Sequence, residues 1–564
     1  MPRSSDEFLH SLSAAARLPL ARCPHTDTLV QTPLVAQAWA DHFFAFRYPY
    51  QRAAIALVSS LRTGVRLGYT GARVGMHKGR NLPTADENIA AIDANMEKEL
   101  ASGRRRGPCD PPPFPFFFSN PLGVVFKKLG GKPRVIHHLS YPRTGGSVNG
   151  NVLELEVKLK AFERAVEDLR ACGQGAFMAK IDIEAAYRNV PVAPEDWPLQ
   201  GMRWKGKFFY DIVMQFGLAS ATAIFEYYSS AAEFFAKRRF GIRFLQHYVD
   251  DFLLMAKSEA ECLRLRDAVL SLFRELGLPY SLEKLEGPIQ QLIFLGILFD
   301  SVSMTLRLSE DRLTELKDLL RAWLGRVTGS RQELQSLCGL LNFASSVVRS
   351  GRIFFKRILA QLRDIEPKAN ADDQHKLYPG FYKDIKWWLD FVDTWNGVAL
   401  LPPPPNAQPS VVVDTDASGK GYGAVITNGT EWLGELWTTE ETDMAARSLT
   451  LSMPWLELRA IVIAAATWGP QWAGRKVLIR SDCKPAVDAW NFENTATEGM
   501  VDLVRTLLFL TATHDFHITV IHIPGVDNPF ADLVSRQQAT RFLELSTTHS
   551  RSPTTPSPPP IQTW

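Results

Sequence analysis

The sequence contains few cysteines, and their spacing excludes the usual structural roles of that residue. Six cysteines are scattered over 564 residues, and no two of them form a CxxC pair. A disulfide framework and a cysteine-based zinc site both need paired or closely spaced cysteines. We therefore expect free or buried thiols in a reducing compartment.

Long apolar stretches and a strong charge of either sign are also missing. No run is long enough to span a bilayer, and the N-terminus lacks the apolar core of a secretory signal. We therefore expect an intracellular protein of the cytoplasm or nucleus with no membrane partner. The 63 Lys and Arg residues against 60 Asp and Glu give a net charge of +3, which permits a nucleic-acid partner without requiring one.

Length and composition predict several globular domains. Hydrophobic residues make up 46% of the chain and charged residues 22%, which are ordinary values for globular proteins. A chain of 564 residues is too long for one core and suggests about three or four domains. Consecutive prolines at 402–405 predict a linker, and the Ser/Thr/Pro-rich stretch 546–564 predicts a disordered tail.

An acidic pair inside an apolar run is the most informative feature of the chain. Asp250 and Asp251 lie within Phe244–Met255, and no Lys or Arg occurs between Arg243 and Lys257. This pattern predicts a β-hairpin whose tight turn presents both carboxylates at a sheet surface. Adjacent anions repel each other, so a hard divalent cation is the usual compensation and a phosphate the usual substrate. An isolated Asp-Asp pair is also common in solvated turns.

A third carboxylate, Asp182, follows the mostly apolar segment Phe177–Ile181. This segment indicates a strand that ends near Asp182, although a helix N-cap is an equally good interpretation of that residue alone. If the strand pairs with the hairpin, Asp182, Asp250 and Asp251 could hold two Mg²⁺ ions, or Mn²⁺ in their place. Two metals about 3.5–4 Å apart activate a 3′-hydroxyl and stabilise a pyrophosphate leaving group.

These segments and their order resemble the motifs of reverse transcriptases. The fingers hairpin and motifs A, B, C, D and E of that family are similar, in turn, to residues 127–134, 177–187, 214–220, 248–251, 282–284 and 294–297. The resemblance covers residues 80–400. It implies a right-hand polymerase with fingers, palm and thumb, followed by a connection region.

The same resemblance implies roles around the incoming nucleotide. Lys127 and Arg134 would bind the dNTP triphosphate. The lysine would act as a point charge, and the arginine would donate two parallel hydrogen bonds. Tyr187 would exclude a 2′-hydroxyl beneath the sugar, and Gln215 would approach the base pair and sugar. Lys284 would donate a proton to pyrophosphate. The ordinary alternatives are solvated hairpin charges, a core tyrosine, a polar helix-start residue and an exposed lysine.

A second set of carboxylates lies beyond the proline-rich linker. Asp416 and Asp482 each follow an apolar, strand-like run, whereas Glu457 and Asp532 fall in helical segments. Four carboxylates from two strand ends and two helices predict a cage for two hard cations. Their order resembles that of ribonucleases H over residues 410–540, which implies an α/β domain that cleaves RNA in RNA–DNA hybrids.

Two residues near this second set have competing interpretations. Asp414 rivals Asp416, but the Asp-x-Ser pattern of the family selects Asp416 and leaves Asp414 on the same strand face as a supporting group. His522 lies ten residues before Asp532, a spacing at which cellular ribonucleases H carry a mobile histidine. Its place inside the strand-like run 518–523 favours a structural role, as in gypsy-like retrotransposons, whose enzymes lack that histidine.

The resemblances predict fused α+β and α/β domains in a definite order. We expect an N-terminal, partly disordered extension, fingers and palm, thumb and connection, a Pro-rich linker, a ribonuclease H-like domain and a disordered tail, over residues 1–80, 81–300, 301–400, 401–409, 410–545 and 546–564.

Residues 137–142 and 147–149 resemble DIRS-like retrotransposons, which encode a tyrosine recombinase in another frame. No aspartic-protease Asp-Thr-Gly motif precedes the polymerase and no zinc-binding integrase follows the nuclease. We take this as fitting that lineage. It weighs against the remaining possibility, a caulimovirus-like or gypsy-like polyprotein fragment.

Two hypotheses from different classes remain open. The leading one is an active enzyme of retrotransposition that copies an RNA template from a DNA or RNA primer and degrades the RNA of the resulting hybrid. The alternative is a decayed or domesticated retroelement protein that only binds nucleic acid or acts as a scaffold. All seven expected carboxylates are present, and random decay would be expected to remove some of them, which favours activity.

Overall fold

The computed structural model describes residues 32–559 except for several short segments. The residues outside the description are 1–31, 127–132, 143–144, 154–156, 158–160, 349–350, 367–372, 396–398, 401–407, 447–451, 492–497 and 560–564. The chain divides into two compact units, Met1–Phe294 and Leu295–Trp564. The expected multidomain class with α+β and α/β parts is confirmed.

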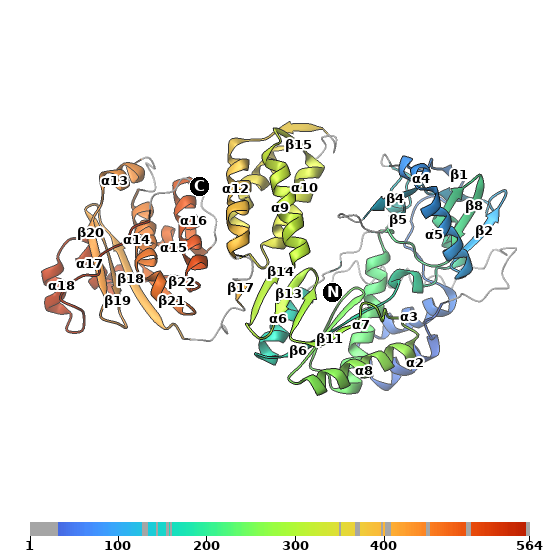
Figure 1. Cartoon of the computed structure of the whole chain (residues 1–564), viewed down its shortest axis with the longest axis horizontal. Helices are drawn as coiled ribbons and strands as arrows, with labels where there is room; N and C mark the ends of the chain where they lie inside the picture. Colours follow the sequence, from blue (N-terminus) through green and yellow to red (C-terminus); the bar gives the residue numbers. More distant parts are fainter. Residues whose placement is uncertain are drawn as a thin grey trace. The chain divides into compact units, whose positions relative to one another are not determined.

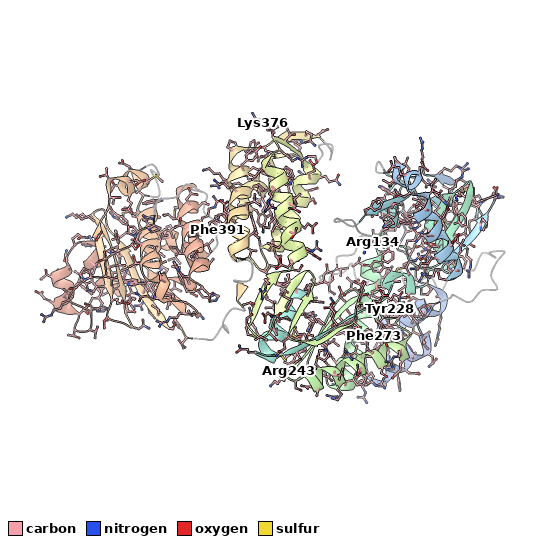
Figure 2. The ribbon with its side chains drawn as sticks, viewed as in Figure 1. Arg134, Tyr228, Arg243, Phe273, Lys376 and Phe391 are labelled. Carbon is pink, nitrogen blue, oxygen red and sulfur yellow. The ribbon has the colours of Figure 1, made fainter. Side chains whose placement is uncertain are left out.

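Helices cover the sheets of the first unit. They are α2 (Ala36–Ala45), α3 (Gln51–Thr63), α4 (Pro83–Glu87), α5 (Ile89–Ala101), α6 (Ala161–Cys172), α7 (Ala221–Phe240) and α8 (Glu259–Leu276). Tyr228 of α7 and Phe273 of α8, both labelled in Figure 2, are fully buried in the main core. Helix α8 begins where the Ser258 hydroxyl accepts the Glu261 N–H and ends at Gly277, whose φ of 75° suits a glycine.

A four-stranded antiparallel sheet, here called the hairpin sheet, carries the acidic pair. Its strand order is β11 (Glu286–Ile289), β6 (Phe177–Asp182), β10 (Asp251–Ala256) and β9 (Phe244–Tyr248). Strands β9 and β10 form the predicted hairpin, with Tyr248 opposite Asp251. Leu245, Phe252 and Leu254 are buried, and burial of these side chains fixes the register.

Two other sheets complete the first unit. One has the order β1 (Met76–Lys78), β3 (Phe117–Ser119), β7 (Gly201–Trp204), β8 (Lys207–Asp211) and β2 (Arg105–Cys109). The other is the predicted hairpin of β4 (Leu122–Phe126) and β5 (Pro133–His137). A short strand, β12 (Gln291–Phe294), ends the unit.

Residues 32–80 are an integral part of the first unit, so the separate extension expected up to residue 80 is wrong for this segment. Trp39 of α2 and Leu57 of α3 belong to the same buried core as the hairpin sheet. The Trp39 indole N–H also donates to the Leu276 carbonyl oxygen at 2.9 Å. The physical reason is the apolar face of each helix, which is buried against α7 and α8. The rest of the expected extension, residues 1–31, lies outside the described residues.

The second unit begins with small strands and a group of helices. These are β13 (Ile297–Asp300), β14 (Thr305–Leu308), α9 (Glu310–Leu324), β15 (Thr328–Ser330), α10 (Arg331–Ala344), α11 (Lys356–Asp364), β16 (Gln374–Lys376), α12 (Pro379–Trp395) and β17 (Ala399–Leu400). A capping box begins helix α10. The Ser330 hydroxyl accepts the Glu333 N–H at 3.2 Å, and the Glu333 carboxylate accepts the Ser330 N–H at 2.8 Å.

A mixed sheet with helices on both faces follows in the same unit. Its order is β20 (Trp432–Leu436), β19 (Gly421–Ile426), β18 (Val411–Ala417), β21 (Lys476–Ser481) and β22 (His517–His522). Figure 1 shows α14 (Ser452–Trp468), α15 (Lys484–Asn491) and α16 (Glu498–Thr513) on one side, and α17 (Pro529–Ser535) and α18 (Ala539–Leu545) on the other. A short helix, α13 (Thr439–Ala446), precedes α14.

Gly423 in β19 explains how α17 comes so close to the sheet. A Cβ atom at this position would lie 2.7 Å from the Ala531 carbonyl oxygen and from the Ser535 backbone nitrogen. Only glycine leaves room for that approach. Gly423 lies inside strand β19 and not in the turn that precedes it.

The C-terminal tail is ordered over residues 546–559, which corrects the prediction of disorder for this part. The Thr554 N–H donates to the Trp432 carbonyl oxygen of edge strand β20 at 2.7 Å. The Arg459 guanidinium of α14 donates to the Pro559 carbonyl oxygen at 2.9 Å. Prolines restrict the unfolded chain, so fixing an extended Pro-rich segment costs little conformational entropy.

In the described part of the chain, no helix is both long and apolar enough to cross a membrane.

Candidate active sites

The hairpin sheet brings the three predicted carboxylates of the first unit to one edge. Asp182 is the last residue of β6, Asp251 is the first of β10, and the two are register partners. Asp250 lies in the turn beside them, and its carbonyl oxygen accepts the Ile183 N–H at 2.9 Å. Asp182 is therefore a strand-end residue and not a helix N-cap.

Burial and mutual repulsion destabilise the charged form of this set. Burial, then the charges of Asp250 and Asp182, raise the pKa of Asp251 to about 6. Burial also raises the pKa of Asp250, and the charge of Asp182 adds to that shift. Carboxylates in such a setting need a nearby cation to remain ionised together.

The cation nearest to Asp182 in the structure is the Lys284 ammonium. Its Nζ lies 2.9 and 3.0 Å from the two Asp182 oxygens, and this hydrogen bonding raises the pKa of Lys284. The lysine side chain is 64% exposed, so solvent screens the pair and makes it easy to open. The sequence placed Lys284 near pyrophosphate, whereas the structure places it on a carboxylate of the site.

The three carboxylates are less tightly grouped than an acidic set in the second unit. Within the described ranges, the only three acidic side chains with one oxygen each within 4.8 Å of the others belong to the second unit. The physical reason is that Lys284 holds Asp182 while the like charges repel each other.

The predicted triphosphate-binding residues belong to the β4–β5 hairpin. Arg134 lies on β5, opposite Val125, and its side chain is exposed (Figure 2). Lys127 lies outside the described residues, as does the turn of this hairpin.

Tyr187 lies in a 3₁₀ turn (Ala186–Asn189) that follows β6, and its ring is fixed on several sides. Its hydroxyl is hydrogen-bonded to the Thr222 hydroxyl at 3.0 Å. The ring centroids of Phe216 and Phe225 lie 5.5 and 5.9 Å away. Burial raises the pKa of Tyr187, so the phenol is protonated at neutral pH. The role of Thr222 has no signal in the sequence, because the residue is one of many in an apolar helix.

Gln215 is fully buried, which differs from both sequence interpretations. It precedes α7 by six residues, and its amide donates to Asp211 Oδ2 and to the Gln200 carbonyl oxygen, each at 3.0 Å. Its own Oε1 is buried without a hydrogen-bond partner among the described residues. The side chain is therefore held inside the protein by these two hydrogen bonds.

An ion-pair network that the sequence does not reveal adjoins Gln215 through Asp211. Asp211 is buried and accepts hydrogen bonds from Arg105 at 2.7 Å and from Arg188 at 2.8 Å. Burial would raise the pKa of Asp211, but the charges of the two arginines outweigh it and hold that pKa well below its usual range. Arg105 lies in the run Arg104–Arg106, and a charge run gives no sign that one member points inward.

Asn149 also supports this segment, and it belongs to a stretch that the sequence analysis singled out. Its side-chain amide donates to the Gly217 carbonyl oxygen, and its Oδ1 accepts the Ala219 N–H, both at 2.9 Å. The same amide reaches the Ser140 hydroxyl at 2.9 Å. Asn149 therefore ties residues 137–142 to the segment that leads into α7.

The second site lies at the end of the central strands of the mixed sheet. Asp416 near the end of β18, Glu457 on α14 and Asp482 after β21 each place one oxygen within 4.8 Å of the others. The parallel pairing of β18 and β21 brings both aspartates to the same edge. This set is the candidate metal centre of the second unit.

The electrostatics of this set favour a bound cation. Burial, then the charges of Asp416 and Asp482, raise the pKa of Glu457 to about 9. Burial is also the largest cause that raises the pKa of Asp416 to about 6. Glu457 Oε2 is buried and has no hydrogen-bond partner among the described residues. An all-oxygen donor set with one unpartnered oxygen fits a hard divalent cation.

Asp532, the fourth predicted carboxylate, lies beside the cluster but points to a different partner. Arg536, one turn later on the chain, donates to Asp532 Oδ1 at 2.7 Å. Ser535 of α17 donates to Asp416 Oδ2 at 2.5 Å, so the same helix contacts the cluster directly. The Asp532 side chain is 39% exposed, and the pair with Arg536 is therefore screened.

His522 and Asp414, the two residues with competing interpretations, both form hydrogen bonds near the cluster. His522 ends strand β22, as the structural interpretation expected, and its Nε2–H donates to the Asp482 carbonyl oxygen at 3.0 Å. Asp414 accepts two hydrogen bonds from Arg480, at 2.5 and 2.8 Å. Asp414 and Arg480 are register partners and lie two residues before Asp416 and Asp482, respectively. Both oxygens of Asp414 therefore accept hydrogen bonds from protein donors.

Comparison with known proteins identifies a family match within residues 134–299 and relatives that cover most of the chain. Residues 134–299 match the family model described as reverse transcriptase (RNA-dependent DNA polymerase). Polyprotein P3 of Commelina yellow mottle virus is 23% identical over 423 residues, covering 73% of this chain and 20% of that protein. The Tf2-3 transposon polyprotein of Schizosaccharomyces pombe is 24% identical over 479 residues, covering 81% of this chain and 31% of that protein.

The chain thus spans less than a third of the length of these curated relatives. The solved structure of the foamy viral protease-reverse transcriptase in complex with double-stranded DNA is similar at a TM-score of 0.48 and 15% identity, covering 89% of this chain and 83% of that chain. The family match shows a reverse transcriptase domain within residues 134–299. Larger parts of the chain are similar to a viral and a transposon polyprotein.

Proposed function

We propose that this chain, which contains a reverse transcriptase domain, is an RNA-directed DNA polymerase with a ribonuclease H domain, and that it serves retrotransposition. The observation that carries the proposal is the presence of two acidic centres, one in each unit. Each centre has carboxylates with raised pKa values. Two centres that each need divalent cations suit two phosphoryl-transfer reactions, DNA synthesis and RNA hydrolysis.

In the polymerase site, Asp182, Asp250 and Asp251 would hold two Mg²⁺ ions, with Mn²⁺ as a substitute. The bound ions would activate the 3′-hydroxyl of a DNA or RNA primer and stabilise the pyrophosphate that leaves the dNTP. Asp182 must release Lys284 before it can bind a cation. The released ammonium is then near enough to the site to neutralise or protonate the pyrophosphate.

The remaining residues of this site would bind and select the nucleotide. Arg134, together with Lys127, would hold the triphosphate through charge-assisted hydrogen bonds. The fixed ring of Tyr187 would leave no room for a 2′-hydroxyl and so favour deoxynucleotides. Gln215 would act from beneath, because its amide is already bonded to Asp211 and Gln200.

In the nuclease site, Asp416, Glu457 and Asp482 would hold two Mg²⁺ ions, and Asp532 would complete the set after it releases Arg536. Ions bound there would supply a hydroxide-like water and stabilise the leaving oxygen of the RNA strand. Ser535 keeps Asp416 in place through its hydrogen bond. The substrate would be the RNA strand of an RNA–DNA hybrid, which the polymerase itself produces from its RNA template.

The lineage that we propose for the element is DIRS-like. Residues 137–142 and 147–149 support this assignment, because they resemble that group and are joined through Asn149. The competing function is a decayed or domesticated protein that binds nucleic acid without catalysis.

The experiment that tests the proposal uses one substitution in each unit. Asp251→Asn should abolish primer extension and leave cleavage of a labelled RNA–DNA hybrid intact. Asp482→Asn should have the opposite effect, with DNA synthesis nearly unchanged. Equal loss of both activities in either variant would contradict two independent centres. A wild-type chain that binds the hybrid but neither extends nor cleaves it would support the competing function.

A further inference from the structure

The turn that carries Asp250 contains a backbone conformation that its sequence disfavours. Val249 has a φ of 56°, in the left-handed region that β-branched residues rarely adopt. The residue is buried and directly precedes the two carboxylates. Because the conformation is unfavourable by itself, neighbouring groups must hold it.

A buried serine on α7 makes the contact that holds this turn. The Ser229 hydroxyl donates to the Val249 carbonyl oxygen at 2.5 Å, and Ser229 is 1% exposed. The hydrogen bond crosses from a helix to the turn residue itself, and α7 is fixed in the main core through Tyr228. The orientation of the Val249–Asp250 peptide is therefore tied to a rigid element.

The same face of α7 also holds strand β9, two residues before Val249. The His247 ring bonds to Glu226 Oε1 at 3.0 Å and, through Nδ1, to the Glu233 carboxylate. Only 7% of the His247 side chain is exposed. Burial alone would lower the pKa of His247, but its bonds to the two glutamates raise it to about 9. The imidazolium therefore stays charged at neutral pH and bonded to both glutamates.

These contacts could serve the general stability of the core, as most buried hydrogen bonds do. Their positions argue for a narrower role. Glu226, Ser229 and Glu233 recur at intervals of three and four residues, so they lie on one helix face. Their partners, His247 and Val249, are the residues that lead directly to the carboxylates. Helix α7 therefore contacts the hairpin at the residues that directly precede Asp250 and Asp251.

We propose that Glu226, Ser229 and Glu233 form a clamp that positions the acidic hairpin, and that Ser229 sets the placement of Asp250 and Asp251 for metal binding. The inference rests on the polymerase function proposed above. Ser229 is a positioning residue here, because it acts through the backbone of Val249 and does not itself reach the substrate.

The test is a graded series at Ser229 with full-length protein. Ser229→Ala removes the donor, and Ser229→Cys keeps a weaker one. The first turnover of primer extension should slow by about tenfold in the alanine variant, the effect of one lost hydrogen bond, and by less in the cysteine variant. The Mg²⁺ concentration for half-maximal rate should rise in the same order, while the burst amplitude, which counts active molecules, stays constant.

Ser60→Ala is the matched control. Ser60 is buried, and its hydroxyl bonds to Tyr228 at 2.6 Å and to the Leu57 carbonyl oxygen at 2.8 Å. Both of these partners lie on helices and not on the hairpin. The control should leave the Mg²⁺ dependence unchanged. If Ser229→Ala and Ser229→Cys only lower the burst amplitude, or match Ser60→Ala in their Mg²⁺ dependence, the clamp has a purely structural role and the inference is wrong. An inactive wild-type chain would instead overturn the proposed function.

Discussion

The Lys284 ammonium lies 2.9 and 3.0 Å from the two carboxylate oxygens of Asp182. It occupies the side of Asp182 that a divalent cation would need. In the proposed function, a divalent cation would compete with this lysine for Asp182 and would have to displace its ammonium. The displaced ammonium would then lie near the pyrophosphate that leaves.

Removal of this lysine should affect metal binding and rate in opposite directions. In Lys284→Leu, the Mg²⁺ concentration for half-maximal primer extension should fall by about two- to fivefold, since a screened pair contributes up to about 1 kcal/mol. The maximal rate should fall by about two to four orders of magnitude, the typical share of a general acid. Lys284→Arg is the control for charge. An unchanged Mg²⁺ requirement in the leucine variant would rule out the competition.

Tyr187 and Thr222 should determine sugar selection together. Tyr187→Ala should admit ribonucleotides, because the ring that blocks the 2′-hydroxyl is removed. Tyr187→Phe and Thr222→Val each break the 3.0 Å hydrogen bond between the two side chains. Each should weaken the preference for dNTPs by a small factor, and the double variant should be no worse than either single one. The ratio of kcat/KM for dNTP and rNTP measures this, and full additivity would argue against a coupled pair.

The nuclease centre should depend on pH through its metal affinity. The folded-state pKa of Glu457 is raised to about 9 and that of Asp416 to about 6, so the metal-free folded state binds protons that an unfolded chain would release. Cation binding must expel those protons. The Mg²⁺ requirement for hybrid cleavage should therefore increase as pH falls from 9 to 6. A requirement that does not change across this range would contradict the assignment of these two ligands.

The same shifts predict how stability depends on pH. Between the unfolded pKa of a glutamate, about 4.3, and the folded value of about 9, rising pH progressively destabilises the metal-free second unit, because the buried carboxyl must ionise. Thermal unfolding in chelator should therefore show decreasing stability from pH 6 to 9. Added Mg²⁺ should recover more stability at pH 9 than at pH 6.

The ordered tail should stabilise the nuclease. A chain that ends at residue 545 loses the contacts of Thr554 with Trp432 and of Arg459 with Pro559, and it leaves a buried guanidinium short of an acceptor. The unfolding temperature of the second unit and its hybrid cleavage should both fall, while primer extension continues. A chain that ends at Pro559 keeps these contacts and is the control. Equal stability of the two chains would show that the tail contributes nothing.

Local chemistry made much of the fold predictable. The YVDD hairpin (248–251), the capping box at Ser330 and the strand ends at Asp182 and Asp482 follow from short patterns of burial and capping, which the sequence displays directly. The aspartates of each centre were identified because acidic residues are unusual after apolar strands. These features depend on neighbours within a few residues.

Long-range contacts explain what the sequence could not predict. The burial of Gln215 depends on Asp211 and Gln200, and the position of Lys284 depends on a strand that ends 102 residues earlier. The tail looked disordered because its composition is simple, yet it bonds to Trp432 and Arg459. Contacts of this kind are set by packing, and no period or motif reports them.

The central claim is that Asp182, Asp250 and Asp251 form a polymerase centre for RNA templates. The most direct measurement is extension of a labelled DNA primer on an RNA template with dNTPs and Mg²⁺, for wild type and Asp250→Asn. We predict full-length DNA from wild type, none in chelator, and synthesis slower by several orders of magnitude in the variant, because Asp250→Asn removes a proposed metal ligand. The contradicting result would be equal extension by Asp250→Asn and wild type.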